Sequence, residues 1–150
     1  MADTIGVHAS KVLSHNGVAA WDCDGAQVSA LWRQLAIVVT VSGEVDAGNI
    51  DEIGKHIRRF ALTGKPVVLD LSAVRAFPVQ GAQCLYDLDE DCGAAGVEWA
   101  LVAGPAVVDA LTRHGDEVPI LASVPDALHH FADVIAMRRQ LLMPLLRKTA

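Results

Sequence analysis

The residues most able to carry out chemistry in this sequence, six histidines and three cysteines, lack the spacing of a metal or catalytic site. No two histidines are four residues apart, and His129 and His130 are neighbours whose side chains point about 100° apart on a helix. His129 and Asp133 can share a helix face, where a solvated i,i+4 pair is the ordinary interpretation. The histidine pattern therefore predicts no bound metal and no cofactor.

The cysteines are open to two interpretations, small buried apolar residues or a redox sensor. Cys84 and Cys92 lie eight residues apart on one predicted helix, so their Cα atoms are about 12 Å apart. A disulfide needs Cα atoms closer than about 7 Å, so these two cannot pair while the helix is intact. Cys23 precedes the predicted core and can in principle reach either of them. We favour the buried apolar role.

Enzyme motifs that depend on glycine spacing are also missing from the sequence. Gly64-Lys65-Pro66 lacks the earlier glycine and the Ser or Thr of a phosphate-binding loop. Gly43 and Gly48 do not form a dinucleotide fingerprint, and no Gly-x-Ser-x-Gly elbow occurs. Since no nucleophile, base and orienting group can be assembled, we expect a protein that binds and does not catalyse.

Length and charge set the next limits. A chain of 150 residues favours one domain, and 52% hydrophobic with 20% charged residues excludes a long disordered chain. The net charge of −6 disfavours nucleic acid and anionic membrane surfaces as partners. The longest uncharged apolar stretch, 99–108, is far shorter than the roughly 20 residues of a membrane span, and Asp3 stands where a signal peptide has a base. We expect a soluble cytoplasmic protein.

Hydrophobic periodicity then indicates the elements of the first half. Residues 1–24 show no sustained period and are predicted to be a loosely ordered N-terminal arm, with the domain spanning 25–143. Residues 27–32 alternate and 35–41 are rich in β-branched side chains, which predicts an antiparallel hairpin. A helix follows, with Asn49 and Glu52 expected as a capping box. Its apolar stripe consists of Ile50, Ile53, Ile57 and Phe60.

The second half repeats a strand–helix unit. Short apolar runs at 67–71, 97–103 and 120–123 predict strands, and the segments between them predict helices. Pro144 should end the last helix near Met143, which leaves 144–150 as a C-terminal tail. Alternation of this kind predicts an α/β fold: a mixed, mostly parallel sheet that starts with a β-hairpin, with about four helices packed against it.

Four segments in matching order resemble STAS domains. Residues 41–46 (V-S-G-E-V-D) are similar to the family's "G-E-[LIV]-D" strand end, and 67–74 (V-V-L-D-L-S-A-V) to its "hhhDLSxV" strand. Gly81 falls at the glycine of its "D-S-S-G" loop, and 96–102 match its glycine-led fourth strand. The resemblance covers roughly 26–136 and implies a single STAS-like domain related to bacterial anti-sigma factor antagonists.

That resemblance implies partner switching as the activity. Such a domain binds an anti-sigma factor, usually of the histidine-kinase-type ATPase fold, and so frees a sigma factor to direct transcription. The usual off-switch is phosphorylation of the first Ser in the "D-S-S-G" loop. Here Pro78, Val79 and Gln80 replace Asp, Ser and Ser, and only Gly81 is kept. Because valine has no hydroxyl, the resemblance implies that the phosphorylation position is lost.

The resemblance also implies where partners bind. An apolar loop that includes Phe77 is expected to be exposed and to favour a protein contact. Asp46 matches the family's acidic residue near that surface, although a role as a loop or cap acid is an equal alternative. The implied partner-binding residues are Asp46, Arg75, Phe77, Pro78, Val79, Gln80 and Gly81.

Two further questions stay open at this stage. Leu141, Leu142, Met143, Leu145 and Leu146 flank Pro144, and they either fold back onto the core or form a patch for a homodimer or another partner. The alternative function is a STAS-type sensor of a small molecule or of redox state, with no role toward a sigma factor.

Overall fold

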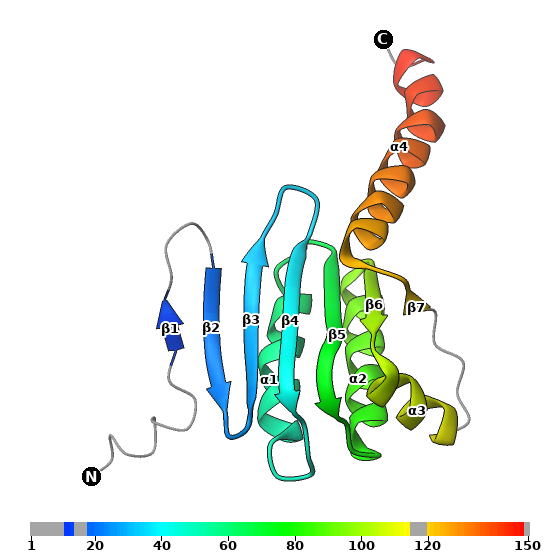
Figure 1. The fold of residues 1–150 in the computed structure, drawn as a ribbon. Coiled ribbons are helices and arrows are strands. Elements are labelled where there is room, and N and C mark those ends of the chain that lie inside the picture. The colour runs from blue at the N-terminus through cyan, green and yellow to red at the C-terminus, as the bar shows by residue number, and fades with distance from the viewer. Residues whose placement is uncertain (1–10, 14–17, 115–119, 149–150) are drawn as a thin grey trace.

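A computed structural model describes residues 11–13, 18–114 and 120–148, with the side chains of 19–113 and 120–142 (Figure 1). Its seven strands form one sheet in which spatial order equals chain order. The strands are β1 (Lys11–Leu13), β2 (Val18–Cys23), β3 (Ala26–Trp32), β4 (Ile37–Glu44), β5 (Val67–Ala76), β6 (Trp99–Ala103) and β7 (Ile120–Leu121). The helices are α1 (Ile50–Ala61), α2 (Gln80–Ala95), α3 (Pro105–His114) and α4 (Val124–Lys148).

The type of strand pairing changes once across the sheet. Strands β1 to β4 pair antiparallel, whereas β4 to β7 pair parallel with a helix in each crossover. The predicted hairpin is β3–β4, with Ala26 opposite Gly43 and Trp32 opposite Ile37. The predicted fold class, a mixed α/β sheet that starts with an antiparallel hairpin and carries four helices, is confirmed. The sheet is not mostly parallel, because three of its six described pairings are antiparallel and three are parallel.

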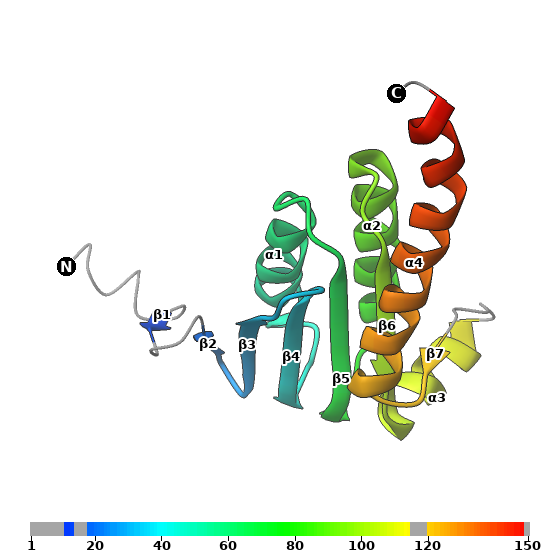
Figure 2. The ribbon, with the colours of Figure 1, turned by 90° about the horizontal axis from the view of Figure 1, so that it is seen from above.

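Helices cover both faces of the parallel part of the sheet. Helices α1 and α2 pack side by side on one face, as Figures 1 and 2 show, and Leu69, Leu85 and Leu101 belong to the larger core there. The apolar stripe predicted for α1 is buried in that core. On the other face, Ala127 and Phe131 of α4 pack against β4, β5 and β6. Alternate residues of the same strands thus enter different cores, which explains their continuous apolar runs.

The prediction that 1–24 is a loose arm is wrong for residues 11–13 and 18–23. Residues 11–13 form β1, which pairs with β2. Residues 18–23 form β2, which pairs with β3 along its whole length, and Trp21 and Cys23 are buried. The reason is the two-residue turn Asp24-Gly25, in which both residues have positive φ (45° and 101°). Such a turn matches the twist of the two strands it joins. Residues 1–10 and 14–17 of the predicted arm lie outside the described residues.

The start of α1 also differs from the prediction. Asn49 is the N-cap residue, but its backbone is helical and its side chain makes no capping hydrogen bond. Its buried amide Nδ2 instead donates to the carbonyl oxygens of Cys23 (3.1 Å), Asp24 (3.1 Å) and Glu44 (2.9 Å). The expected capping box with Glu52 is therefore absent, because Asn49 ties the β2–β3 turn to the end of β4.

The last helix is longer than predicted. Helix α4 runs to Lys148 and passes Pro144, so residues 144–148 are helical and not a tail. A proline inside a helix removes one backbone hydrogen bond but does not have to end the helix. The second half of α4 extends beyond the sheet (Figure 1). Residues 149–150 of the predicted tail are outside the described part of the chain.

Candidate functional site

The residues implied as partner-binding lie at one edge of the sheet. Strands β4 and β5 are parallel, so their carboxyl ends meet there, and the Val45 amide donates to the Ala76 carbonyl oxygen at 2.9 Å. Asp46 lies two residues after the end of β4, and the loop that leads into α2 follows β5. The fold therefore brings Asp46 beside the segment from Arg75 to Gly81, although about 30 residues separate them in the chain.

Asp46 has a structural role at this edge while its side chain stays exposed. Its Oδ1 accepts the backbone amides of Gly48 (2.8 Å) and Asn49 (3.0 Å). Its own amide donates to Oδ1 of Asn49 at 2.9 Å. Asp46 thus holds the loop that starts α1, which is the cap-acid role considered from the sequence. Its exposed carboxylate remains available to a partner at the same time.

Phe77 is more buried than the sequence suggested. The expectation of an exposed Phe77 is wrong: it is half-buried and packs against the larger core. Gly81 explains this, because a Cβ placed there would overlap the Cε2 and Cζ atoms of Phe77 and lie 2.9 Å from Cδ2. The absence of a side chain at Gly81 therefore gives the Phe77 ring its position under the first turn of α2.

Val79 is the main exposed apolar residue of this edge. It is the N-cap residue of α2, 63% exposed, and makes no side-chain capping bond. Gln80 and Arg75 are also exposed, while Pro78 is half-buried. The first turn of α2 contains no acidic residue. This surface can bury apolar area against a protein, but valine at its centre offers neither a nucleophile nor a phosphate acceptor.

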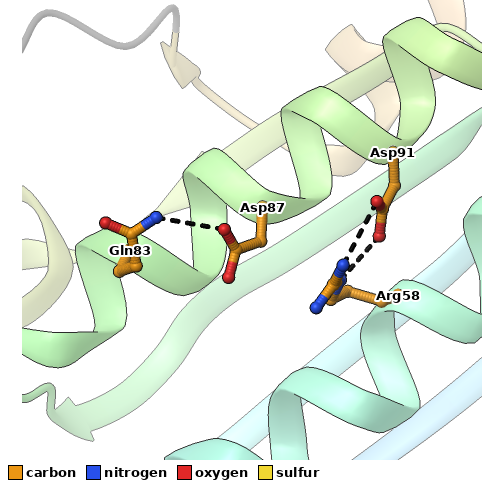
Figure 3. Close-up of polar contacts among 4 residues, drawn as sticks. All are labelled: Arg58, Gln83, Asp87 and Asp91. Atoms are coloured by element: carbon orange, nitrogen blue, oxygen red, sulfur yellow. Dashed lines mark hydrogen bonds and ion pairs between the residues drawn. The ribbon is translucent and has the colours of Figure 1, made fainter.

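Helix α2 is held in position by polar contacts on its outer side. Figure 3 shows Arg58 of α1 facing Asp91 of α2, with Nε–Oδ2 at 2.6 Å and Nη2–Oδ1 at 3.2 Å. The hydrogen bonds and charge of Arg58 lower the pKa of the Asp91 carboxyl. Within α2, Gln83 donates to Asp87 at 3.0 Å. The Arg58–Asp91 pair therefore joins α2 to α1, whereas the Gln83–Asp87 bond lies within α2.

A separate cleft lies at the other end of α2. It has a volume of about 580 Å³ and is lined by residues of α2, β6 and α4, including Tyr86, Val97 and Trp99. Trp99 Nε1 donates to Asp89 at 2.8 Å, and Arg138 Nη2 lies 2.6 Å from Glu98 Oε1. Aromatic walls with a few charged groups are typical of a small-molecule site. None of the residues predicted as partner-binding lines this cleft.

The three cysteines are free thiols in environments that keep them protonated. Burial is the main cause that raises the pKa of Cys23, Cys84 and Cys92, each to about 11, and nearby carboxylates add to it. Redox-sensing cysteines have lowered pKa values, because the thiolate is the reactive form. The environments of these thiols therefore agree with the buried apolar role.

Asn49 supports the candidate site in a way that the sequence did not predict, because the sequence pattern indicated only a helix cap. Asn49 joins the β2–β3 turn, the end of β4 and the start of α1, and so places Asp46. Its three acceptors come from segments that only the folded sheet brings together. Its position after a loop signals a cap, but no local pattern signals this bridging role.

Comparison with known proteins gives consistent matches. Residues 27–127 match the STAS domain model. Osmosensory protein A of Mycobacterium tuberculosis is 48% identical over 148 residues, which is 95% of this chain and 94% of that protein. A solved anti-sigma factor antagonist from Mycobacterium paratuberculosis has a TM-score of 0.65 and 26% identity, covering 73% of this chain and 96% of that one. RsbS of Moorella thermoacetica, solved as a variant, shares the fold with a TM-score of 0.62 at 18% identity, over 73% of this chain and 97% of its own. Among the described helices, none is long and apolar enough to cross a membrane.

Proposed function

Because the chain belongs to the STAS domain family, we propose that it is an anti-sigma factor antagonist-like regulator that controls transcription by partner switching in the cytoplasm. The observation that carries the proposal is the exposed Val79 at the start of α2, at the edge where Asp46 also lies. The likeness to a solved anti-sigma factor antagonist supports it.

The proposed docking surface consists of Asp46, Arg75, Phe77, Pro78, Val79, Gln80 and Gly81. Val79 supplies an apolar centre, while Asp46, Arg75 and Gln80 supply an exposed polar rim, which is the usual anatomy of a protein interface. Phe77 and Gly81 contribute by packing against each other, which positions the loop that carries Val79. The proposed partner is an anti-sigma factor of the histidine-kinase-type ATPase fold.

The proposed regulation differs from the family's usual switch. Residues 74–81 contain no hydroxyl, so a phosphate cannot be attached to this loop by the usual Ser or Thr chemistry. In relatives with a Ser at this position, a phosphate would place negative charge against a docked partner. We propose that this chain binds its partner constitutively through the loop, and that control is exerted elsewhere.

The cleft beside Trp99 supports a second candidate function, a sensor of a small molecule without a role toward a sigma factor. Its volume of about 580 Å³ falls in the range of ligand pockets. The relative from Mycobacterium tuberculosis is named an osmosensory protein, which supports a sensing role. The redox version of this candidate is the weaker one, since burial raises the pKa of all three thiols.

A homodimer through the C-terminal apolar segment remains part of the proposal. Met137, Leu141 and Leu142 on α4 are 63%, 69% and 54% exposed, so these side chains do not fold back onto the core. The side chains of Met143, Leu145 and Leu146 lie outside the described ones. Light scattering at several protein concentrations tests this, and a mass of one chain throughout would reject the homodimer.

Affinity capture separates the two candidate functions. The purified chain is immobilised and offered anti-sigma factors of the histidine-kinase-type ATPase fold, each in complex with its sigma factor. Partner switching predicts that one anti-sigma factor is retained while its sigma factor is released. If none is retained, and a small solute raises the melting temperature of the chain instead, the sensor function replaces the first proposal.

A further inference from the structure

Three side chains with metal-binding atoms meet between β2 and α1, and none of them belongs to the proposed docking surface. Cys23 Sγ, a Glu52 carboxylate oxygen and one imidazole nitrogen of His56 all lie within 4.8 Å of one another. Cys23 is fully buried, His56 is 7% exposed, and Glu52 is half-buried, which gives the cluster a path to solvent. Nothing in the partner-switching proposal uses these three residues.

The histidine in this cluster has unused bonding capacity. His56 Nδ1 is buried and has no hydrogen-bond partner among the described residues. Leaving a buried polar atom without a partner usually costs about 1–3 kcal/mol. Here a buried imidazole with an unpartnered nitrogen lies next to a thiol and a carboxylate. This arrangement is expected of a metal site, in which a bound ion supplies the missing interactions.

The fold holds the three residues in place before any ion binds. Glu52 and His56 are four residues apart and so lie on the same face of α1. The His56 ring stacks on Trp21, with centroids 4.8 Å apart and an interplanar angle of 27°. The Cys23 carbonyl accepts a hydrogen bond from Asn49 at 3.1 Å, which fixes the end of β2 against the start of α1.

We propose that Cys23, Glu52 and His56 bind one Zn²⁺ ion, with water in the fourth position. A thiolate, an imidazole and a carboxylate are the three ligand types that Zn²⁺ combines in tetrahedral sites. Mg²⁺ and Ca²⁺ prefer all-oxygen ligand sets and fit this cluster poorly. Tetrahedral Zn²⁺ places its ligand atoms about 3.4 Å apart, so the side chains close by no more than about 1.4 Å from the present spacing.

The local charge favours the ion. Glu52 and Asp22 both place negative charge close to the Cys23 thiol. The same charge attracts a divalent cation. As the Zn–S bond forms, the S–H bond breaks and its proton leaves to solvent, while Glu52 and the neutral imidazole ligate without losing a proton. The ion would join β2 to α1 and so stabilise the first antiparallel strands.

Metal titration of the untagged, chelator-treated chain tests the site. Co²⁺ serves as the spectroscopic probe and Zn²⁺ as the competitor. We expect one Co²⁺ per chain, with a thiolate-to-cobalt charge-transfer band and the strong visible bands of tetrahedral cobalt, and displacement by Zn²⁺. Zn²⁺ at about 100 times its Kd should raise the melting temperature by about 5–10 °C.

Matched variants identify the ligands. Cys23→Ser should abolish the charge-transfer band, while Cys84→Ser and His129→Gln should keep it. Glu52→Gln changes a half-buried side chain and should stay folded, yet weaken Zn²⁺ binding by at least about 10-fold. The proposal is overturned if the wild-type chain binds no Zn²⁺ at 100 µM, or if folded Glu52→Gln binds it with unchanged affinity.

Discussion

Replacing Gly81 with alanine perturbs the contact that sets the proposed docking loop. Gly81 is buried in the first turn of α2, and an added Cβ would overlap two ring atoms of Phe77. Gly93 offers a matched control in the same helix, because a Cβ there meets no atom within 4 Å. The two substitutions are chemically identical, so their difference measures the Phe77 contact.

The expected effects have opposite signs. Alanine is favoured over glycine inside a helix by about 0.5–1 kcal/mol, so Gly93→Ala should raise the free energy of unfolding by that amount. At Gly81 the same gain is opposed by overpacking, which typically costs about 1–3 kcal/mol. We expect Gly81→Ala to lower the free energy of unfolding by about 1–2 kcal/mol, which corresponds to a melting temperature about 2–8 °C lower.

Denaturant unfolding of Gly81→Ala, Gly93→Ala, Phe77→Leu and the double variant Gly81→Ala/Phe77→Leu measures these values. The smaller leucine should recover part of the loss, so the double-mutant cycle should show a favourable coupling of at least about 0.5 kcal/mol. If Gly81→Ala stabilises the chain as much as Gly93→Ala does, Phe77 does not pack under α2 and the account of this loop is wrong.

Three other predictions concern modification, thiols and pH. Incubation with ATP and an anti-sigma kinase should leave residues 74–81 without phosphate, and peptide mapping that locates one there would refute the loop assignment. Mild oxidation of folded protein should give no Cys84–Cys92 disulfide, because both residues lie on α2 about 12 Å apart; a high yield of that peptide pair would mean that the helix opens readily. Burial lowers the pKa of His56 below its usual 6.5 in the folded state. The unfolded state therefore binds a proton at this residue more tightly than the folded state does. The contribution of His56 to the free energy of unfolding is present above pH 6.5 and is lost as the pH falls through the folded-state pKa. In chelator, His56→Gln should show a smaller loss of unfolding free energy between pH 7 and pH 5 than wild type, and equal slopes would contradict the assignment.

Local patterns predicted the parallel half of the fold well. The stripe of Ile50, Ile53, Ile57 and Phe60 depends only on the helical period, and all four side chains are buried. The apolar runs of β5 and β6 could be identified as strands covered on both faces because they lack alternation. The motifs around Gly43 and Gly81 indicated segments that the fold brings together at one edge of the sheet.

Other features required contacts between distant segments. Strand β2 has Ala20 and Asp22 between its buried residues, and its clearest local signal is the Asp24-Gly25 turn that follows it. Asn49 finds its acceptors in two segments that are distant in sequence, the adjacent Cys23 and Asp24 and the end of β4 at Glu44. Its spacing to Glu52 suggested a capping box, which does not form. Glu52 and His56 have the i,i+4 spacing of two ligands on one helix face. The third proposed ligand, Cys23, could not be predicted from the sequence, because only the pairing of β2 in the sheet brings it next to them.

The central claim is that the loop around Val79 docks an anti-sigma factor, and Val79→Glu tests it. Val79 is 63% exposed and stands at the N-terminus of α2, where the helix dipole favours a negative charge. The free energy of unfolding should therefore change by no more than about 1 kcal/mol. Leu62→Glu is the control. Leu62 is 79% exposed and follows the C-terminal end of α1, whereas Asp46 of the docking surface precedes the N-terminal end of that helix.

Titration calorimetry of wild type, Val79→Glu and Leu62→Glu against the anti-sigma factor retained in the capture experiment is the decisive measurement. Desolvating the new carboxylate at an apolar contact should cost about 2 kcal/mol, so the account predicts roughly 30-fold weaker binding for Val79→Glu and unchanged binding for Leu62→Glu. Equal affinities for wild type and a folded Val79→Glu would contradict it.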